Sequence, residues 1–378
     1  MLVADGKVLE VGTEGDVDIP KGAQQVEVGS KYIMPGMINS HGHIGGTEGL
    51  EGGKYSKENV IRDLALNARY GVTTVVSLGG DGEASVAIRN AQETSDLNHS
   101  RIFIAGTIVT GDSPEAVRQV VQENAKNKVD FIKIRVDDNL GASVKMPVDI
   151  YSAVIDEAHK NNIPVASHLY YLEDAMGLLE AGTDYIAHSI RDKEVSQSLI
   201  GLIKQKDVYY CPTLMREVSV FAYADTPDFL SDPFLLNETD PAVITALKAP
   251  ERQKRIKDNP RTKVYEEALV MAMRNLKTLS DNGVKIVMGT DAGPPARFQG
   301  YFEHKELELM VAAGLTPMQA IVAATGDAAK YLDLKGIGTL EKGKWADFIL
   351  MEKNPLENIS NTQSLEQVWI AGNKVPGK

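Results

Sequence analysis

Six side chains of this 378-residue chain have the chemistry of metal ligands and share one kind of position. Each lies at or near the end of a short apolar segment, and a parallel barrel carries its active site where its strands end. The six are His41 and His43 in PGMINSHGHI, Lys133 in DFIKIRV, His168 in IPVASH, His188 in DYIAH and Asp291 in VMGTDAG. Because neutral imidazoles bind zinc and similar ions well, the pattern predicts a metal site assembled from distant parts of the chain.

Lys133 is the least usual member of this set. Side chains alternate between the two faces of a strand, so the isoleucines and Val136 of DFIKIRV would meet the outer helices while Lys133 points into the barrel. A bare ammonium in that position is costly to desolvate. A carboxylate partner would relieve the cost, and so would conversion by CO2 to a carbamate, whose two oxygens can bridge two metals.

Asp291 ends the last apolar segment and admits two interpretations. Its carboxylate could ligate a metal and accept a proton from a bound water, whose pKa a metal lowers to roughly 7. Alternatively, it could only form the turn before Ala292 and Gly293. The convergence of the other five candidates favours the first interpretation.

Four further residues are candidates for substrate contact. Tyr170 shares a face with His168 and could donate a hydrogen bond to a substrate oxygen. Arg135 lies on the inward face of its strand and Arg216 follows the seventh strand, so either could hold a substrate carboxylate through two hydrogen bonds. His304 opens the helix after the last strand, close to the expected mouth of the barrel.

The middle of the chain alternates strand-like and helix-like segments. GVTTVVSL, RIFIAGT and DFIKIRV are strand-like, whereas SPEAVRQVVQENAKN has a Ser cap and a Pro at the first helical position. About eight strand candidates alternate with helices, which predicts an α/β protein with a closed (β/α)8 barrel. Residues 215–262, rich in Asp, Pro and Asn, interrupt this alternation as an irregular insertion, either a lid or substrate loop or a surface elaboration.

The two ends of the chain are β-like. Asp5-Gly6 between apolar runs is a hairpin signal, and GKWADFILMEKNP and SLEQVWIAGNKV are strand-like. We therefore expect residues 1–35 and 336–378 to form one small composite β-sandwich domain, and residues 36–335 to form the barrel.

Composition excludes several classes of function. The net charge of −12 and the pI near 5.2 argue against a nucleic-acid surface. The longest apolar runs are too short or too interrupted to span a bilayer. Cys211 is the only cysteine, so no intrachain disulfide forms, and no signal peptide opens the chain. These features predict a cytoplasmic protein that acts on a small molecule, with a periplasmic or secreted location if a signal peptide was removed.

Several longer segments carry a family resemblance. MPGMINSHGHI, YGVTTVVSLGG, AGTDYIAHS, VMGTDAG, AGLTPMQAIVAATGDAAKYL and IGTLEKGKWADFILMEKNPL together resemble the amidohydrolase superfamily. Within it, the chain looks most like the branch of imidazolonepropionase-like and Xaa-Pro-dipeptidase-like hydrolases. The resemblance runs nearly from end to end, although Ser77 and Leu78 stand where similar proteins often have an Arg-Asp pair.

This resemblance implies two divalent ions, zinc or else Mn, Co or Fe, with three sets of ligands: His41, His43 and Asp291 for the more buried ion, His168 and His188 for the more exposed ion, and a carboxylated Lys133 between them. Imidazolonepropionase is similar to enzymes that bind a single metal ion and lack a lysine at the position of Lys133. The presence of Lys133 therefore favours the dipeptidase-like branch. Similar proteins are commonly homo-oligomers, which makes a homo-oligomer the expectation here.

The expected reaction is hydrolysis of an amide bond in a small molecule such as a dipeptide or an N-acyl amino acid. A hydroxide bridging the two ions would attack the carbonyl, and Asp291 would carry the proton to the leaving amine. The same hydroxide could attack a lactone, a carbamate or a phosphotriester. Some barrels of this kind have a structural role after losing metal ligands. The complete set of candidate ligands argues against such a role here.

Overall fold

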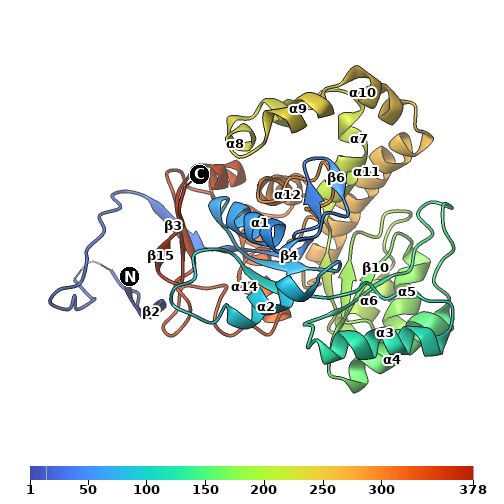
Figure 1. The fold of residues 1–378 in the computed structure, drawn as a ribbon, viewed down its shortest axis with the longest axis horizontal. Helices are drawn as coiled ribbons and strands as arrows, with labels where there is room; N and C mark the ends of the chain where they lie inside the picture. The colour runs from blue at the N-terminus through green and yellow to red at the C-terminus, as the bar shows by residue number, and fades with distance from the viewer. Residues whose placement is uncertain (14, 378) are drawn as a thin grey trace.

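The computed structural model describes residues 1–13 and 15–377. Its strands alternate with helices along most of the chain (Figure 1). The strands are β1 Leu2–Ala4, β2 Lys7–Glu10, β3 Tyr32–Pro35, β4 Met37–Gly42, β5 Thr47–Glu48, β6 Glu51–Gly52, β7 Val72–Ser77, β8 Arg101–Ile104, β9 Ile132–Arg135, β10 Val165–His168, β11 Tyr185–Ala187, β12 Tyr209–Cys211, β13 Phe348–Met351, β14 Leu365–Ile370 and β15 Asn373–Lys374.

Seven of these strands form two parallel sheets, in the orders β4-β7-β8 and β9-β10-β11-β12. On one side, the Val109 N–H donates to the Lys133 carbonyl at 2.8 Å and joins the segment after β8 to β9. On the other side, residues 285–292 lie between β12 and β4. There the Tyr210 N–H donates to the Lys285 carbonyl at 2.9 Å and the Asp291 N–H donates to the His41 carbonyl at 2.7 Å. The parallel segments therefore follow one another in a hydrogen-bonded ring. Residues 285–292 belong to this ring through isolated β-bridges to β12 and β4.

Helices begin where the sequence supplies caps. The Ser113 hydroxyl accepts from the Ala116 N–H at the start of α3, and Pro114 occupies the first helical position as expected. The helices are α1 Lys57–Arg69, α2 Glu83–Ala91, α3 Pro114–Lys126, α4 Val148–Lys160, α5 Leu172–Ala181, α6 Gln197–Gln205, α7 Leu214–Phe221, α8 Pro233–Leu236, α9 Pro241–Leu247, α10 Pro250–Lys257, α11 Pro260–Asp281, α12 Tyr301–Ala312, α13 Pro317–Ala323 and α14 Gly326–Tyr331, with short 3-10 turns at η1 Ala222–Ala224, η2 Asp228–Ser231 and η3 Ile359–Gln363.

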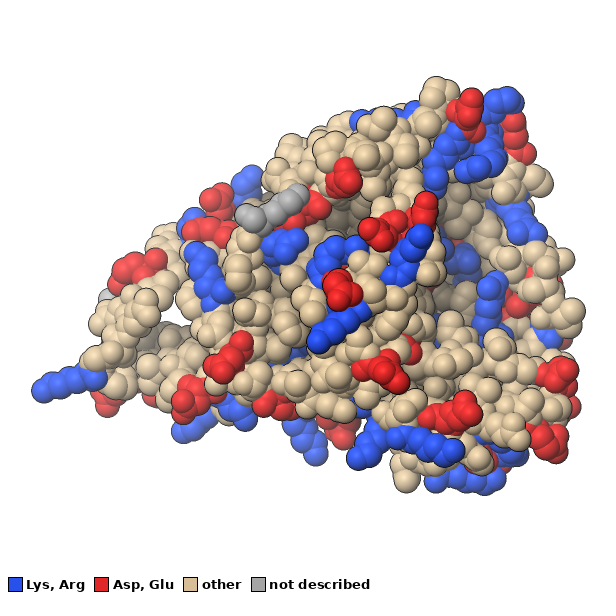
Figure 2. Space-filling view, viewed as in Figure 1, with Lys and Arg blue, Asp and Glu red and all other residues tan. Residues whose placement is uncertain are grey.

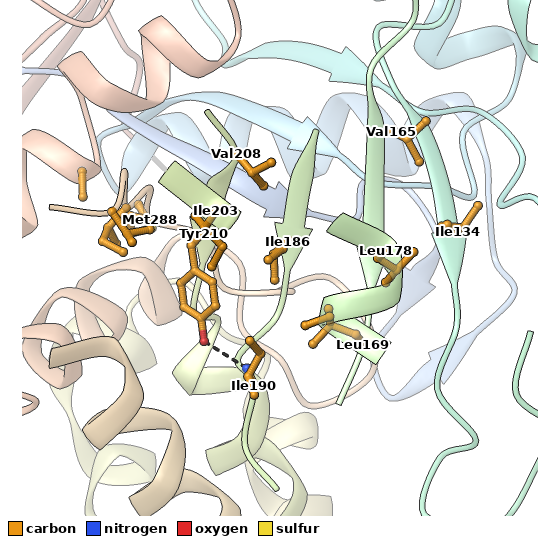
Figure 3. Packing of buried hydrophobic residues seen from close by; sticks show 14 of the residues in the cluster. Ile134, Val165, Leu169, Leu178, Ile186, Ile190, Ile203, Val208, Tyr210 and Met288 are labelled. Carbon is orange, nitrogen blue, oxygen red and sulfur yellow. Dashed lines mark hydrogen bonds between the residues drawn. The ribbon is translucent and has the colours of Figure 1, made fainter. Parts of the chain in front are cut away.

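The apolar core lies on both faces of the parallel strands. On the outer face, Ile134, Val165 and Ile186 of the strands pack against Leu178 and Ile203 of the helices (Figure 3). A second buried cluster contains side chains from the opposite strand faces: Phe131, Ala166, Tyr185, Ala187, Cys211 and Val287. This alternation of faces along β9 to β12 is the one expected from the sequence. Apolar side chains fill both faces, and the polar side chains are found at the strand ends.

Strands from both ends of the chain share a second sheet. β3 pairs antiparallel with β13 in the order β15-β14-β13-β3. The β1–β2 hairpin turns at Asp5-Gly6 as expected and joins the rest through a bridge between Lys7 and Trp345. Residues 15–31 form no strand and run along the edge of the molecule (Figure 1). The division into two domains at residues 36 and 336 stays a prediction.

The expectation that residues 215–262 are irregular was wrong, and their role as a lid or a surface elaboration stays a prediction. Most of this stretch is helical, because proline at the first position and a cap before it start one short helix after another. Asp232, Asp240 and Asn259 accept backbone hydrogen bonds at the starts of α8, α9 and α11. None of the helices in the described part of the chain is both long and apolar enough to cross a membrane.

Candidate metal centre

The six residues expected as metal ligands meet at the ends of the parallel strands. Contacts connect all of them, and they come from these places: His41 in β4 and His43 just after it, Lys133 in β9, His168 at the end of β10, His188 directly after β11, and Asp291 in the segment between β12 and β4.

His41, His43 and Asp291 form the tightest group. Nε2 of His43 lies 2.9 Å from Oδ1 of Asp291, and Nε2 of His41 lies 3.6 Å from the same oxygen. One potential ligand atom from each residue lies within 4.8 Å of the other two. Nδ1 of His43 is 3.0 Å from the Gly79 carbonyl oxygen, which can only accept, so Nδ1 carries the proton and Nε2 is the free electron-pair donor.

Lys133 points into the same space, as its place in the strand predicted. Its Nζ lies 3.2 Å from Nε2 of His41, and the residue is 3% exposed. Burial lowers the pKa of Lys133 to about 8, although the nearby Asp291 carboxylate acts against this. A larger share of neutral amine is therefore present near pH 7 than for an exposed lysine, and the neutral amine is the form that reacts with CO2.

His168 and His188 form the adjoining half of the centre. The ring of His188 has its centroid 4.6 Å from that of His41 and 4.2 Å from that of His168. Nδ1 of His188 is 2.7 Å from the Thr213 hydroxyl, and Nε2 of His168 is 2.9 Å from Oδ2 of Asp137. Each ring is thus oriented through one nitrogen and keeps the other for a ligand.

Burial sets the charge of the centre. It lowers the pKa of His41 and His188 well below the usual range and that of His168 to about 4. Burial alone would raise the pKa of Asp291, but Arg297, followed by the two neighbouring histidines, holds it well below its ordinary value. At neutral pH the centre therefore contains neutral imidazoles and a carboxylate, the forms that bind metal ions.

The backbone is strained at this centre. Asp291 has φ +56°, His188 +140° and Thr213 +46°, all in a region that non-glycine residues rarely adopt. Such residues cost on the order of 1–3 kcal/mol each and persist where surrounding contacts fix them. Gly293 has φ +116°, and a Cβ there would lie 2.0 Å from the carbonyl oxygen of His43. Local backbone strain thus accompanies the side chains that carry the chemistry.

Three of the four expected substrate contacts lie around this centre. Tyr170 is 5% exposed and packs under the guanidinium of Arg191, 4.5 Å from its ring centroid. Arg216 is 7% exposed, and its charge contributes to the low pKa of His168. The side chain of Arg135 is 44% exposed, and its Nε lies 3.3 Å from Oδ1 of Asp137. Their contact with a substrate stays a prediction.

His304 does not fit the predicted role. Its Nδ1 lies 2.9 Å from the Thr362 hydroxyl and its Nε2 lies 2.8 Å from the Tyr70 carbonyl oxygen. The residue is 0% exposed, so both ring nitrogens are occupied and no substrate reaches them. The prediction from its position at the start of a helix was wrong because the ring faces α1 and η3 instead of the strand ends.

The sequence did not identify several polar residues that lie at the centre. Asp137 lies two residues beyond Arg135, just after the end of β9, so extending the alternation of strand faces could have identified it. Arg297 donates to the Asp291 carboxylate from a loop without periodicity, and nothing in the sequence indicated this. Buried Glu303 accepts from Asn39 and from the Thr290 hydroxyl, and so joins the first strand to the last segment.

The donor set fits a divalent metal ion. The imidazoles of buried His41 and half-buried His43 and the carboxylate of Asp291 place ligand atoms close together, and this is a composition that zinc and similar ions accept. Lys133 and His188 extend this group towards His168, so a second ion has donors nearby.

Comparisons with known proteins find relatives over nearly the whole chain. The model of the amidohydrolase family matches residues 32–375. The chain is 25% identical over 437 residues to ochratoxinase of Aspergillus niger, covering 100% of this chain and 82% of that protein. It is 23% identical over 370 residues to imidazolonepropionase of Pyrobaculum arsenaticum, covering 93% and 85%. The solved structure of a Xaa-Pro dipeptidase with bound methionine matches with a TM-score of 0.75 and 21% identity, covering 99% of this chain and 94% of the other.

The chain therefore belongs to the amidohydrolase family. It is a hydrolytic enzyme of the class that acts on carbon–nitrogen bonds.

Proposed function

We propose that this protein is a binuclear metal-dependent hydrolase that cleaves an amide bond of a small molecule, with its site in a (β/α)8 barrel. The observation that carries the proposal is the gathering of six side chains from five separate segments at one set of strand ends. Active sites of such barrels lie at this end of the strands.

The side chains would divide between two ions. His41, His43 and Asp291 would hold the first ion, because their ligand atoms already converge. His188 and His168 would hold the second ion through the ring nitrogens that Thr213 and Asp137 leave free. Lys133 lies beside His41, and a carbamate on its Nζ would supply two further ligand oxygens.

Bound divalent ions supply an activated water at neutral pH and polarise the carbonyl that it attacks. The chain's own residues then manage the proton. Asp291 turns Oδ1 towards the histidines and Oδ2 towards Arg297, so one oxygen can serve as a ligand while the other accepts and returns a proton. The neutral state of His41 and His168 keeps competing protons out of the ligand set.

An amide is the proposed bond because the relatives point to carbon–nitrogen chemistry. One structural relative is named as a dipeptidase, and the family name itself denotes amide hydrolysis. A dipeptide or an N-acyl amino acid has the size of a small-molecule substrate. A lactone, a carbamate and a phosphotriester belong in the same substrate panel, because the same nucleophile attacks all of them.

Metal analysis combined with activity assays tests the proposal. Protein reconstituted with Zn, Mn or Co is expected to hold two equivalents and to hydrolyse amides. The His168→Asn variant is expected to hold less metal, and Asp291→Asn to lower kcat by about 100- to 10,000-fold because a proton carrier is lost. The matched control is His159→Asn, since that side chain is 42% exposed and pairs with Asp184 on the surface. Amide hydrolysis at the full rate by metal-free protein would refute the proposal.

A further inference from the structure

The helix α12 carries two buried glutamates, Glu303 and Glu306. They are three positions apart, so the two side chains leave the helix on the same side. Both residues are 0% exposed, whereas Figure 2 shows other acidic side chains at the surface among Lys and Arg. The groups that donate hydrogen bonds to the two glutamates are neutral. A buried carboxyl group is costly unless it is hydrogen-bonded, so these donors indicate what the glutamates hold in place.

Glu306 caps a neighbouring helix. Its Oε1 accepts from the Leu214 N–H and its Oε2 from the Met215 N–H, each at 2.7 Å. Both N–H groups belong to the first turn of α7, where a helix has no acceptors of its own. The helices α12 and α7 pack against each other. A side chain from a distant segment therefore fixes the start of the helix that follows β12.

Thr213 is the residue that usually would provide this cap. It directly precedes α7, and threonine at that position commonly accepts from an N–H of the first turn. Its side chain makes no such bond, and its hydroxyl lies 2.7 Å from Nδ1 of His188 instead. Because Glu306 supplies the cap, the hydroxyl of Thr213 is available to orient the ring of His188.

Glu303 reaches the other half of the centre through two buried polar residues. Its Oε1 accepts from the Thr290 hydroxyl at 3.1 Å and from the side-chain amide of Asn39. Oδ1 of Asn39 in turn accepts from the N–H of His41 at 3.0 Å and from that of Thr290 at 3.3 Å. The network therefore holds the backbone at His41 and the backbone immediately before Asp291.

We propose that α12 is the positioning element of the metal centre, with Glu306 and Glu303 as positioning residues for its two halves. Glu306 acts on the half that contains His188, and Glu303 acts on the half that contains His41 and Asp291. This inference rests on the proposed function. Each glutamate acts through intervening residues and backbone, so its removal should change how a ligand is held while the ligand itself stays present.

The two glutamates use their oxygens differently, and this difference makes the proposal testable. Both oxygens of Glu306 accept from backbone N–H groups. A glutamine there would turn an amide N–H2 towards one of these donors, and two donors would face each other. In Glu303 only Oε1 accepts, because Oε2 is buried without a hydrogen-bond partner in the described structure. A glutamine at 303 keeps the accepting oxygen, so one substitution has opposite expected results at two places on the same helix.

Metal titration with chelator competition measures the affinity for each ion. We expect Glu306→Gln to weaken the second ion by about 10- to 100-fold and to leave the first unchanged, because the partner behind His188 loses its anchor. Glu303→Gln is the matched control and should leave both affinities unchanged. Glu303→Leu removes the acceptor and should weaken the first ion by a similar factor. The titrations are done above pH 8, since burial raises the pKa of Glu306 to about 8.

Nitrogen NMR of histidine-labelled, metal-free protein separates this inference from the proposed function. His188→Gln assigns the signal of His188. Wild type and Glu303→Gln should show this ring protonated at Nδ1, which donates to the Thr213 hydroxyl, whereas Glu306→Gln should show both tautomers in a protein that thermal unfolding reports as folded. Should Glu306→Gln fail to fold, Glu306→Asp is the second variant, because it keeps the charge but withdraws both oxygens from α7.

The outcomes divide as follows between the two proposals. If wild-type protein binds no metal, the proposed function fails, and the NMR comparison alone decides whether Glu306 positions His188. An unchanged His188 signal in the Glu306 variant, or an equal loss of metal affinity in Glu306→Gln and Glu303→Gln, would overturn the inference.

Discussion

Lys133 shows at the scale of one residue how burial prepares a side chain for chemistry. An exposed lysine near neutral pH is almost entirely an ammonium, whereas burial lowers the pKa of Lys133 to about 8. The same desolvation keeps His168 neutral, with a pKa of about 4. One physical cause therefore provides both an amine able to react with CO2 and imidazoles able to bind metal.

Asp137 offers a prediction at this scale. Its Oδ2 lies 2.9 Å from Nε2 of His168 and orients the ring. We expect Asp137→Asn to weaken binding of the second metal ion by about 10- to 100-fold, because a carboxylate behind a histidine ligand fixes its orientation and raises its basicity. Chelator competition measures the change. Asp138→Asn is the control, because the neighbouring Asp138 accepts from the Tyr171 hydroxyl instead. Equal metal affinity in both variants would argue against this role.

At the scale of the elements, the turn after the last parallel segment holds Asp291 in place. Gly293 has φ +116°, and a Cβ there would lie 2.0 Å from the carbonyl oxygen of His43. We expect Gly293→Ala to destabilise the protein by about 2 kcal/mol or more and to lower metal content, because the turn must shift away from β4. Thermal unfolding and metal analysis check this. Gly46→Ala is the matched control, since no atom lies within 4 Å of a Cβ at Gly46 and its φ is not positive.

His304 ties α12 to η3 and to the end of α1, and this role has a pH dependence. Burial lowers the pKa of His304 to about 4 in the folded chain, against 6.5 for an ordinary histidine. Between these values the unfolded chain binds the extra proton more readily, so stability falls as the pH drops from 6.5 towards 4. On going from pH 7.5 to pH 5, wild type is therefore expected to lose about 1–2 kcal/mol more stability than His304→Gln.

Denaturant unfolding of metal-free protein at the two pH values measures this difference. Thr362→Val serves as the control, because it removes the hydroxyl partner of His304 but leaves the ring to titrate. Its stability should be lower at both pH values and should fall with pH in parallel with wild type. A parallel fall for His304→Gln as well would exclude His304 as the cause.

At the scale of the whole molecule, the proposed metal binding would be coupled to folding. The candidate ligands come from segments between residues 41 and 291, so ions held by them would bind only the folded chain. Metal removal is therefore expected to lower the unfolding midpoint, since a ligand at one hundred times its Kd stabilises by about 2.7 kcal/mol per site. Thermal scans with and without chelator measure the effect. Asp291→Asn should show a much smaller shift, and an unchanged midpoint in wild type would contradict the coupling.

The remaining expectations about the whole molecule concern its location, its oligomeric state and its division into domains. The structure places β3, from the first part of the chain, beside β13 from the last part, which joins both ends in one sheet. A cytoplasmic location, a homo-oligomeric state and the division into two domains stay predictions.

The sequence by itself determined most of the strand and helix pattern outside residues 215–262, and it identified six candidate ligands that lie together at the strand ends. It could do so because strand alternation and helix caps are local properties, and because ligands at strand ends follow from the alternation. The direction of Lys133 and the hairpin at Asp5-Gly6 are examples of such local control.

Only the tertiary structure decided which polar groups stand behind and around these ligands. Arg297 meets Asp291 and Arg216 shares Glu217 with Arg191 because a loop and the helix α7 pack over the strand ends. His304 turned away from the centre for the same kind of reason. Such contacts depend on the paths of loops and the angles at which helices pack, and those are set by the summed burial of many residues, not by spacing along the chain.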